Sequence, residues 1–190
     1  MEKIKAIIRS SIDVKVAVLE SEYFVGLIES VSQLITAQLR AGNKVLFCGN
    51  GGSAADAQHL AAEFSGRFYV DRPALPAEAL HCNTSYLTAV ANDYSYDVIY
   101  SRLLQGIGHP GDVLIGMSTS GNSKNIVEAM KTAREKQIIT IGMTGETGGL
   151  MKDLSDHLFN VPSLDTPRIQ EAHMLIGHII CQLVEEYYFS

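Results

Sequence analysis

The stretch Lys44-Val-Leu-Phe-Cys-Gly-Asn-Gly-Gly-Ser53 joins a compact apolar run to a glycine-rich turn, and a helical pattern follows from Ala54 to about Phe64. A short apolar run bounded by turn residues is typical of a strand that is buried on both faces. The same order of apolar run, polar turn and helix recurs along the chain. The further strand candidates are residues 74–80 (the weakest), 113–117, 138–143 and 157–161. Strands that alternate with helices predict an α/β fold, here a doubly wound α/β/α sandwich with a five-stranded parallel sheet.

Two helices are expected before this body, because apolar residues recur there at helical spacing. These residues are Ile4, Ile7, Ile8, Ile12 and Val16, then Phe24, Leu27, Ile28, Val31, Leu34, Ile35 and Leu39. We therefore expect a single domain over residues 1–190, with a helical N-terminal segment at 1–41 and an α/β body at 42–190. The N-terminal helices could pack on the body or on a partner subunit. A last long helix is expected from Pro167 to Tyr187.

The composition excludes several classes of protein. A net charge of -6 and a pI near 5.5 disfavour a nucleic-acid binder that uses a broad basic surface. Three scattered cysteines favour free thiols in a reducing compartment. The charged N-terminal segment lacks the apolar core of a secretory signal, and no apolar run is long enough to span a bilayer. We therefore expect a cytoplasmic protein with no membrane partner.

Polar loops follow three of the predicted strands, at residues 49–53, 118–123 and 144–149. In parallel sheets, ligands bind outside the carboxyl ends of the strands, so these loops should lie together. The loop Ser118-Thr-Ser-Gly-Asn-Ser123 has four hydroxyls where a helix begins. Free amides at a helix N-terminus suit an anion such as phosphate. An ordinary N-cap is the alternative, but one hydroxyl is enough for a cap.

Two helices hold residues that could do acid–base or metal chemistry. His59 and Glu63 are four residues apart and share one helix face, so they could bind one metal ion or transfer protons. A helix-surface interaction is the alternative for this pair. The last helix holds His173 and His178, and either histidine could instead be a helix residue with satisfied hydrogen bonds.

Taken together, the motifs resemble those of the phosphoheptose isomerases, which are members of the SIS (sugar isomerase) family. The matching motifs, in order, are Gly49-Asn-Gly-Gly-Ser53, His59 with Glu63, Arg67, Asn92-Asp93, Ser118-Thr-Ser-Gly-Asn-Ser123, and Arg168-Ile-Gln-Glu-Ala-His173 followed by His178. The resemblance covers essentially the whole chain. It implies an SIS-type fold and an enzyme that converts sedoheptulose 7-phosphate to D-glycero-D-manno-heptose 7-phosphate. That reaction is the first step toward nucleotide-activated heptoses for lipopolysaccharide or related glycans.

The resemblance also implies roles for individual residues. Glu63 and His178 would be the catalytic acid–base pair. Zinc, one ion per subunit, would be bound by His59, Glu63, Gln170 and His178. The residues implied to contact substrate are Asn50, Gly51, Gly52, Ser53, Glu63, Arg67, Asn92, Asp93, Ser118, Thr119, Ser120, Ser123 and Gln170. The family is typically a homotetramer with its sites between subunits.

Two details qualify this assignment. In some relatives an Asp precedes the Arg of the Arg-Ile-Gln-Glu motif, whereas Pro167 takes that place here and Asp165 lies two residues earlier. Gln170 and His178 are separated by a rise of about 12 Å on an ideal helix, and zinc bonds are only about 2.0–2.2 Å long. We therefore expect these two ligands at one metal ion to come from different subunits, or the helix to be irregular near Gln170. Because a carboxylate held tightly by zinc is a poor base, metal binding should be labile or partial.

Two other functions remain open at this stage. The chain could be an SIS module that binds a sugar phosphate or associates with the replication initiator without catalysis, although such relatives lack the residues seen here at Glu63 and His178. It could also be another SIS enzyme, such as an aminosugar-phosphate isomerase or an etherase. A purely structural scaffold has the least support, because a scaffold needs no clustered polar loops.

Overall fold

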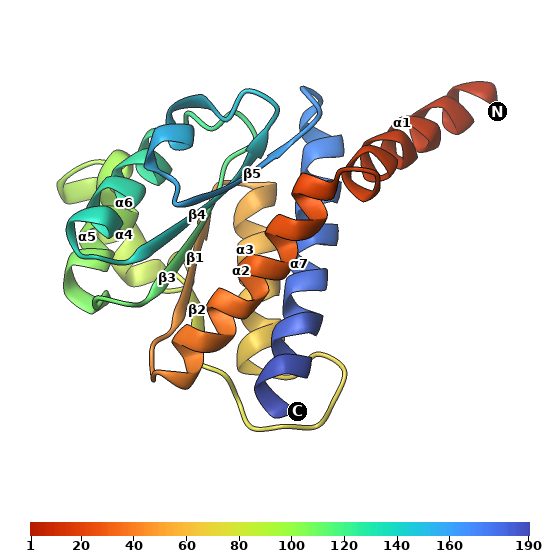
Figure 1. Ribbon diagram of the computed structural model, residues 1–190. Helices are drawn as coiled ribbons and strands as arrows, with labels where there is room; N and C mark the ends of the chain where they lie inside the picture. Colours follow the sequence, from red (N-terminus) through yellow and green to blue (C-terminus); the bar gives the residue numbers. More distant parts are fainter.

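The computed structural model describes residues 1–190 and contains one parallel sheet with helices on both faces (Figure 1). The strand order is β2-β1-β3-β4-β5. The strands are β1 (Val45–Gly49), β2 (Ala77–Ala79), β3 (Val113–Met117), β4 (Ile139–Gly145) and β5 (His157–Val161). All neighbouring pairs run parallel. The predicted doubly wound α/β fold with five parallel strands is confirmed.

The two faces of the sheet are covered by different helices. One face packs against α2 (Glu22–Arg40), α3 (Gly52–Ser65) and α7 (Thr166–Phe189), seen to the right of the sheet in Figure 1. The other face carries α4 (Thr84–Asp93), α5 (Ile99–Ile107) and α6 (Lys124–Glu135). Every residue of β1 and β3 is buried. This burial on both faces explains why these strands read as unbroken apolar runs.

The helix α1 (Glu2–Leu19) projects away from the body at the N-terminal end of the chain (Figure 1). Only its Val18 is buried, whereas Ile4 is 62% exposed and Ile8 is 55% exposed. A groove of about 430 Å³ lies between the end of α1, α2 and α7 and is lined almost entirely by apolar side chains. The second predicted helix, α2, buries its apolar stripe on the body.

The observed element boundaries differ from the predicted ones by a few residues. Helix α3 begins at Gly52 rather than Ala54, because Gly51 adopts a φ of 56° and serves as the N-cap. Strand β4 continues to Gly145, and α7 extends from Thr166 to Phe189. The segment after β4 forms a 3₁₀ helix, η2 (Gly149–Leu154). A second 3₁₀ helix, η1 (Tyr96–Val98), precedes α5.

None of the helices combines the length and the apolar character needed to cross a membrane. All three cysteines are free, as expected, and Cys48 and Cys181 are buried.

Candidate functional site

The loops after β3 and β4 are joined by backbone hydrogen bonds at the carboxyl edge of the sheet. The Gly145 amide donates to the Thr119 carbonyl at 2.9 Å, and the Met151 amide donates to the Gly121 carbonyl at 3.0 Å. Gly121 has a φ of 67°, and a Cβ at this position would lie 2.1 Å from the Gly148 carbonyl oxygen. Gly121 is therefore required for the close contact between these two loops, a reason that the sequence alone did not indicate.

A cluster of hydroxyls lies at the N-terminus of α6. The Ser118 hydroxyl is 2.9 Å from that of Ser123 and 3.4 Å from that of Ser120. Ser123 is the N-cap residue of α6, but its side chain makes no capping hydrogen bond. Ser123 therefore occupies the N-cap position without its hydroxyl acting as a cap. The hydroxyl cluster thus lies at a helix N-terminus without capping it, and a helix N-terminus suits an anion.

The Asn50 side chain connects the loop after β1 to the start of α6. Its amide group exchanges two hydrogen bonds with the Asn125 amide group, at 2.9 and 2.8 Å. The Tyr96 hydroxyl also donates to the Asn50 Oδ1 atom, at 3.0 Å. Asn125 and Tyr96 were not predicted to belong to the site, because no local spacing relates either residue to Asn50. These bonds place the two loops that follow β1 and β3 in a fixed relation.

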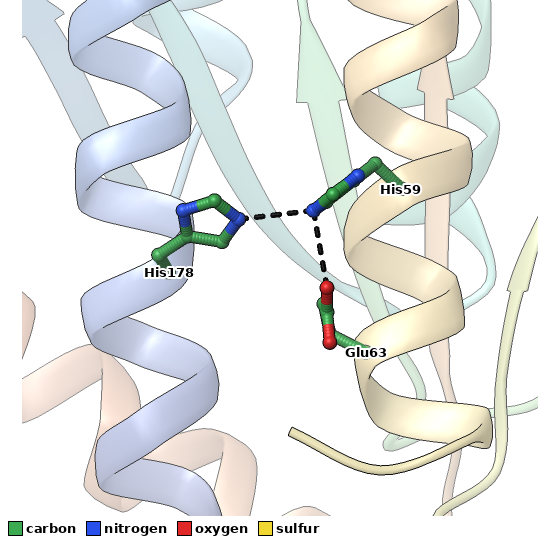
Figure 2. A group of neighbouring side chains, drawn as sticks. All are labelled: His59, Glu63 and His178. Atoms are coloured by element: carbon green, nitrogen blue, oxygen red, sulfur yellow. Dashed lines mark hydrogen bonds and ion pairs between the residues drawn. The ribbon is translucent and has the colours of Figure 1, made fainter. Parts of the chain in front are cut away.

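His59, Glu63 and His178 form a cluster between α3 and α7 (Figure 2). The His59 Nε2 atom lies 3.0 Å from the His178 Nε2 atom and 3.1 Å from the Glu63 Oε1 atom. His59 is exposed, whereas Glu63 and His178 are half-buried. The Phe68 ring packs against His178 with a centroid separation of 5.8 Å. The His59–Glu63 pair is thus part of a larger group rather than an isolated helix-surface interaction.

The cluster has the donor set of a metal site. Its three candidate ligand atoms lie within 4.8 Å of one another. Tetrahedral zinc with bonds of about 2.0–2.2 Å separates its ligand atoms by about 3.4 Å. Two imidazole nitrogens and one carboxylate oxygen at the observed spacing fit such an ion after small side-chain shifts. The same groups can also transfer protons, since an imidazole and a carboxylate lie within hydrogen-bonding reach of each other.

Gln170 lies apart from this cluster. Its Nε2 atom would be 2.7 Å from a Cβ placed on Gly52, so its side chain covers the N-terminal end of α3. Helix α7 runs without interruption from Thr166 to Phe189. The expected alternative of an irregular helix near Gln170 is therefore wrong, and Gln170 and His178 do not meet within one chain.

The remaining predicted residues occupy three places. Gly51 and Gly52 are exposed at the start of α3, and Ser53 is buried in its first turn. Arg67 is exposed after the end of α3 and makes no hydrogen bond or ion pair within the chain. Asn92 and Asp93 end α4, where the Asn92 amide donates to the Asp93 carboxylate at 2.9 Å.

The predicted site therefore falls into two groups within one chain. The loops at the carboxyl edge form the first, and the histidine–glutamate cluster forms the second. Glu63 is eleven residues after Gly52 on the same helix, a rise of about 16 Å. One chain alone does not bring the hydroxyl loop and Glu63 into a single pocket.

His173 differs from His178 in its surroundings. It is fully buried, and its Nε2 atom lies 3.0 Å from the Thr144 carbonyl oxygen. Burial lowers the pKa of His173 to about 4, although the hydrogen bond to Thr144 acts in the opposite direction. His173 is thus a neutral core residue that holds α7 against β4, whereas His178 faces the cluster.

The chain is similar in sequence and in overall structure to known proteins. A sequence model of the SIS domain family matches residues 17–145. A phosphoheptose isomerase from Aneurinibacillus thermoaerophilus is 56% identical over 98% of this chain and 94% of that protein. Phosphoheptose isomerase 2 from Campylobacter jejuni is 52% identical over 98% of this chain and 93% of that protein. The solved structure of a phosphoheptose isomerase from Neisseria gonorrhoeae has a TM-score of 0.91 at 41% identity, covering 97% of this chain and 98% of that one.

Proposed function

The chain belongs to the SIS domain family and, within it, to the phosphoheptose isomerases, and we propose that it converts sedoheptulose 7-phosphate to D-glycero-D-manno-heptose 7-phosphate. It is an enzyme of the phosphosugar isomerase class. The observation that carries the specific proposal is the cluster of His59, Glu63 and His178, where a carboxylate and two imidazoles are joined by contacts of 3.0 and 3.1 Å. A protein that only binds a sugar phosphate needs no such acid–base group.

The reaction moves one proton between neighbouring carbons. A base removes the proton from carbon 1 of the ketose, which gives an enediol or enediolate, and a proton is then delivered to carbon 2. Oxygen 1 loses its hydroxyl proton and becomes the aldehyde oxygen, while oxygen 2 gains a proton and becomes a hydroxyl. Glu63 and His178 are the two groups that exchange these protons, one at carbon and the other at oxygen. Both groups are half-buried between α3 and α7.

His59, Glu63 and His178 would hold a zinc ion, with Gln170 from another subunit as a further ligand. Bound zinc would supply Lewis-acid stabilisation of the negative charge that develops on the sugar oxygens. We expect one zinc site per subunit. Because Glu63 would share its carboxylate between metal binding and proton transfer, zinc should bind this site labilely or with partial occupancy. The metal content of the purified protein, compared with that of a His59→Asn variant, tests this directly.

The phosphate of the substrate would bind at the hydroxyl loop. Ser118, Ser120 and Ser123 supply hydroxyls beside the N-terminus of α6, with Thr119 in the same loop. Asn50, Gly51, Gly52 and Ser53 border this position from the loop after β1. Arg67, Asn92 and Asp93 are exposed, which leaves them free to contact the sugar from a neighbouring subunit.

We further propose a homotetramer with its sites between subunits. The rise of about 16 Å between Gly52 and Glu63 on α3 supports this, since it separates the two halves of the site within one chain. The exposed apolar side chains of α1 and the groove beside them provide a surface that a second copy could cover. An isolated subunit would therefore be inactive.

The product would enter the synthesis of nucleotide-activated heptoses for lipopolysaccharide or related glycans. A cytoplasmic location belongs to the same proposal and is supported by three free thiols.

A panel of phosphorylated ketoses and aldoses tests the function. We expect turnover of sedoheptulose 7-phosphate, with D-glycero-D-manno-heptose 7-phosphate identified as product. Tight binding of the ketose without turnover would favour the non-catalytic SIS module. Preferred turnover of an aminosugar phosphate or a lactyl ether would assign another SIS enzyme.

A further inference from the structure

A buried ion pair joins the end of α3 to α7. The Arg72 Nε atom lies 2.6 Å from the Glu185 Oε2 atom, and the two side chains are only 3% and 4% exposed. Arg72 lies on the segment that follows α3, which we call the 66–73 segment, and Glu185 lies near the end of α7. Neither residue was singled out by the sequence patterns.

Glu185 fixes the backbone of the 66–73 segment. Its Oε1 atom accepts hydrogen bonds from the amides of Tyr69 and Val70, at 2.8 and 3.0 Å. Its Oε2 atom accepts from the Phe68 amide at 3.1 Å as well as from Arg72. A single carboxylate thus binds three consecutive amides and a guanidinium, which determines the path of the chain after Gly66.

Arg72 fixes the end of α3. Its guanidinium donates to the carbonyl oxygens of Glu63 and Phe64, at 2.8 and 2.9 Å. These carbonyls belong to the last turn of the helix, where backbone acceptors lack partners within the helix. The guanidinium therefore holds the residue whose side chain is the carboxylate of the cluster.

The same ion pair is also connected to His178, through α7 and through Phe68. Glu185 follows His178 by seven residues, or two helical turns, so both side chains lie on one face of α7. The Phe68 amide is bound by Glu185, and the Phe68 ring packs against the His178 ring at 5.8 Å. Arg67 immediately precedes this anchored residue.

We propose that Glu185 and Arg72 are positioning residues for catalysis, because their ion pair sets the relation between Glu63 on α3 and His178 on α7 and fixes the backbone that follows Arg67. The inference rests on the proposed isomerase function. A buried ion pair adds little net stability compared with well-packed apolar residues. Its value here lies in geometry, since a charged group with several fixed partners permits few alternative arrangements.

The variant Glu185→Gln tests the pair with almost no change in volume. In one orientation of the amide, its NH₂ group faces the Arg72 Nε atom and the Phe68 amide, and in the other it faces the amides of Tyr69 and Val70. Donor would meet donor in either case. We expect kcat to fall about tenfold or more, since a displacement of about 1 Å can cost about 100-fold in rate. Arg72→Lys should lower kcat to a similar extent, because lysine lacks the planar guanidinium that donates to several acceptors at once.

Asp112→Asn is the matched control. Asp112 is a buried carboxylate that pairs with Lys44 Nζ at 2.6 Å and accepts from the amides of Lys44 and His109, at 3.0 and 2.8 Å. It lies just before β3, at the opposite edge of the sheet from the loops. We expect this control to lose thermal stability as Glu185→Gln does, yet to keep kcat within about twofold of the wild type. The proposal fails if folded Glu185→Gln and Arg72→Lys keep the wild-type kcat, or if the control loses as much.

Two further measurements decide the matter if Glu185→Gln does not fold. Phe68→Leu leaves the ion pair intact and removes only the ring that contacts His178, and it should lower kcat with a small change in melting temperature. The imidazole signals of His178, assigned in NMR spectra of the full-length protein with a His178→Gln variant, should move in Phe68→Leu and Arg72→Lys but not in Asp112→Asn. Unchanged His178 chemical shifts in both Phe68→Leu and Arg72→Lys would overturn the inference. This measurement needs no substrate, so it remains decisive even if the wild type fails to isomerise the heptose phosphate and the proposed function is wrong.

Discussion

His59 on α3 and His178 on α7 meet through their Nε2 atoms at 3.0 Å, although 119 residues separate them in the sequence. The contact joins the helix that starts at the glycine-rich loop to the helix that ends the chain. Glu63 completes the group at 3.1 Å from the same His59 atom.

Replacing Glu63 with Gln should abolish turnover while leaving the fold and substrate binding nearly unchanged. The amide keeps the size of the side chain but cannot accept a proton from carbon. We expect kcat to fall by about 100-fold to 10,000-fold. Isothermal titration with the ketose phosphate, beside an activity assay, separates binding from chemistry. Glu128→Gln, at an exposed ion pair with Lys131 on α6, serves as the control. Undiminished activity of Glu63→Gln would remove Glu63 from the mechanism.

Ser123→Ala should weaken phosphate binding without weakening the helix. Ser123 makes no capping bond in α6, whereas the Ser21 hydroxyl accepts from the Phe24 amide at 3.3 Å in α2. Ser21→Ala should therefore lower the free energy of unfolding by about 1 kcal/mol, and Ser123→Ala by much less. Conversely, Ser123→Ala should raise KM about tenfold or more, because it removes a hydrogen bond to a charged group. Chemical denaturation and steady-state kinetics on both variants check the two effects, and an unchanged KM for Ser123→Ala would count against the phosphate loop.

Stability should fall as the pH is lowered from about 6.5 towards 4, with His173 as one cause. Burial lowers its pKa to about 4 in the folded protein, whereas the unfolded chain has a value of about 6.5. Between these values the unfolded state binds more protons, so stability rises with pH and the contribution is lost as the pH falls. The full effect is on the order of 3 kcal/mol. Chemical denaturation at several pH values gives the free energy of unfolding as a function of pH. This free energy should rise less steeply with pH in His173→Gln than in the wild type. Equal slopes for the two proteins would contradict this role.

Two inactive variants should restore activity when they share an oligomer. If Gln170 and Glu63 at one site come from different subunits, mixing Gln170→Ala with Glu63→Gln leaves some sites with both residues intact. Random assortment in a symmetric oligomer would leave about one quarter of the sites intact. Activity is measured after the variants are unfolded together and refolded, with each variant refolded alone as the control. No gain in activity would show that one subunit supplies both residues.

The central strands β1, β3 and β4 were predictable because they are buried on both faces and therefore form continuous apolar runs. β3 and β5 match their predicted bounds. The sequence signal for β2 was weak because this strand has only three residues, preceded by two prolines and followed by a turn. The helix start at Gly52 was misplaced because it depends on the positive φ of Gly51, which is a property of the backbone rather than of the pattern. Local periodicity therefore predicted the elements better than their ends.

The candidate site was only partly accessible to sequence reasoning. Spacing placed His59 beside Glu63, but their contact with His178 depends on how α3 packs on α7. Asn125 and the Arg72–Glu185 pair were missed for the same reason, since their partners are distant in the sequence. His173 and His178 look equivalent in the helical pattern, yet only the fold shows that one is buried against Thr144 and the other faces the cluster.

The most direct test of the isomerase mechanism is proton NMR of the purified protein with sedoheptulose 7-phosphate in deuterated water. If Glu63 transfers the carbon proton, the wild type should form a new aldose phosphate that carries solvent deuterium at carbon 2, and Glu63→Gln should not. Unchanged ketose, or an aldose formed equally fast by Glu63→Gln, would contradict this mechanism.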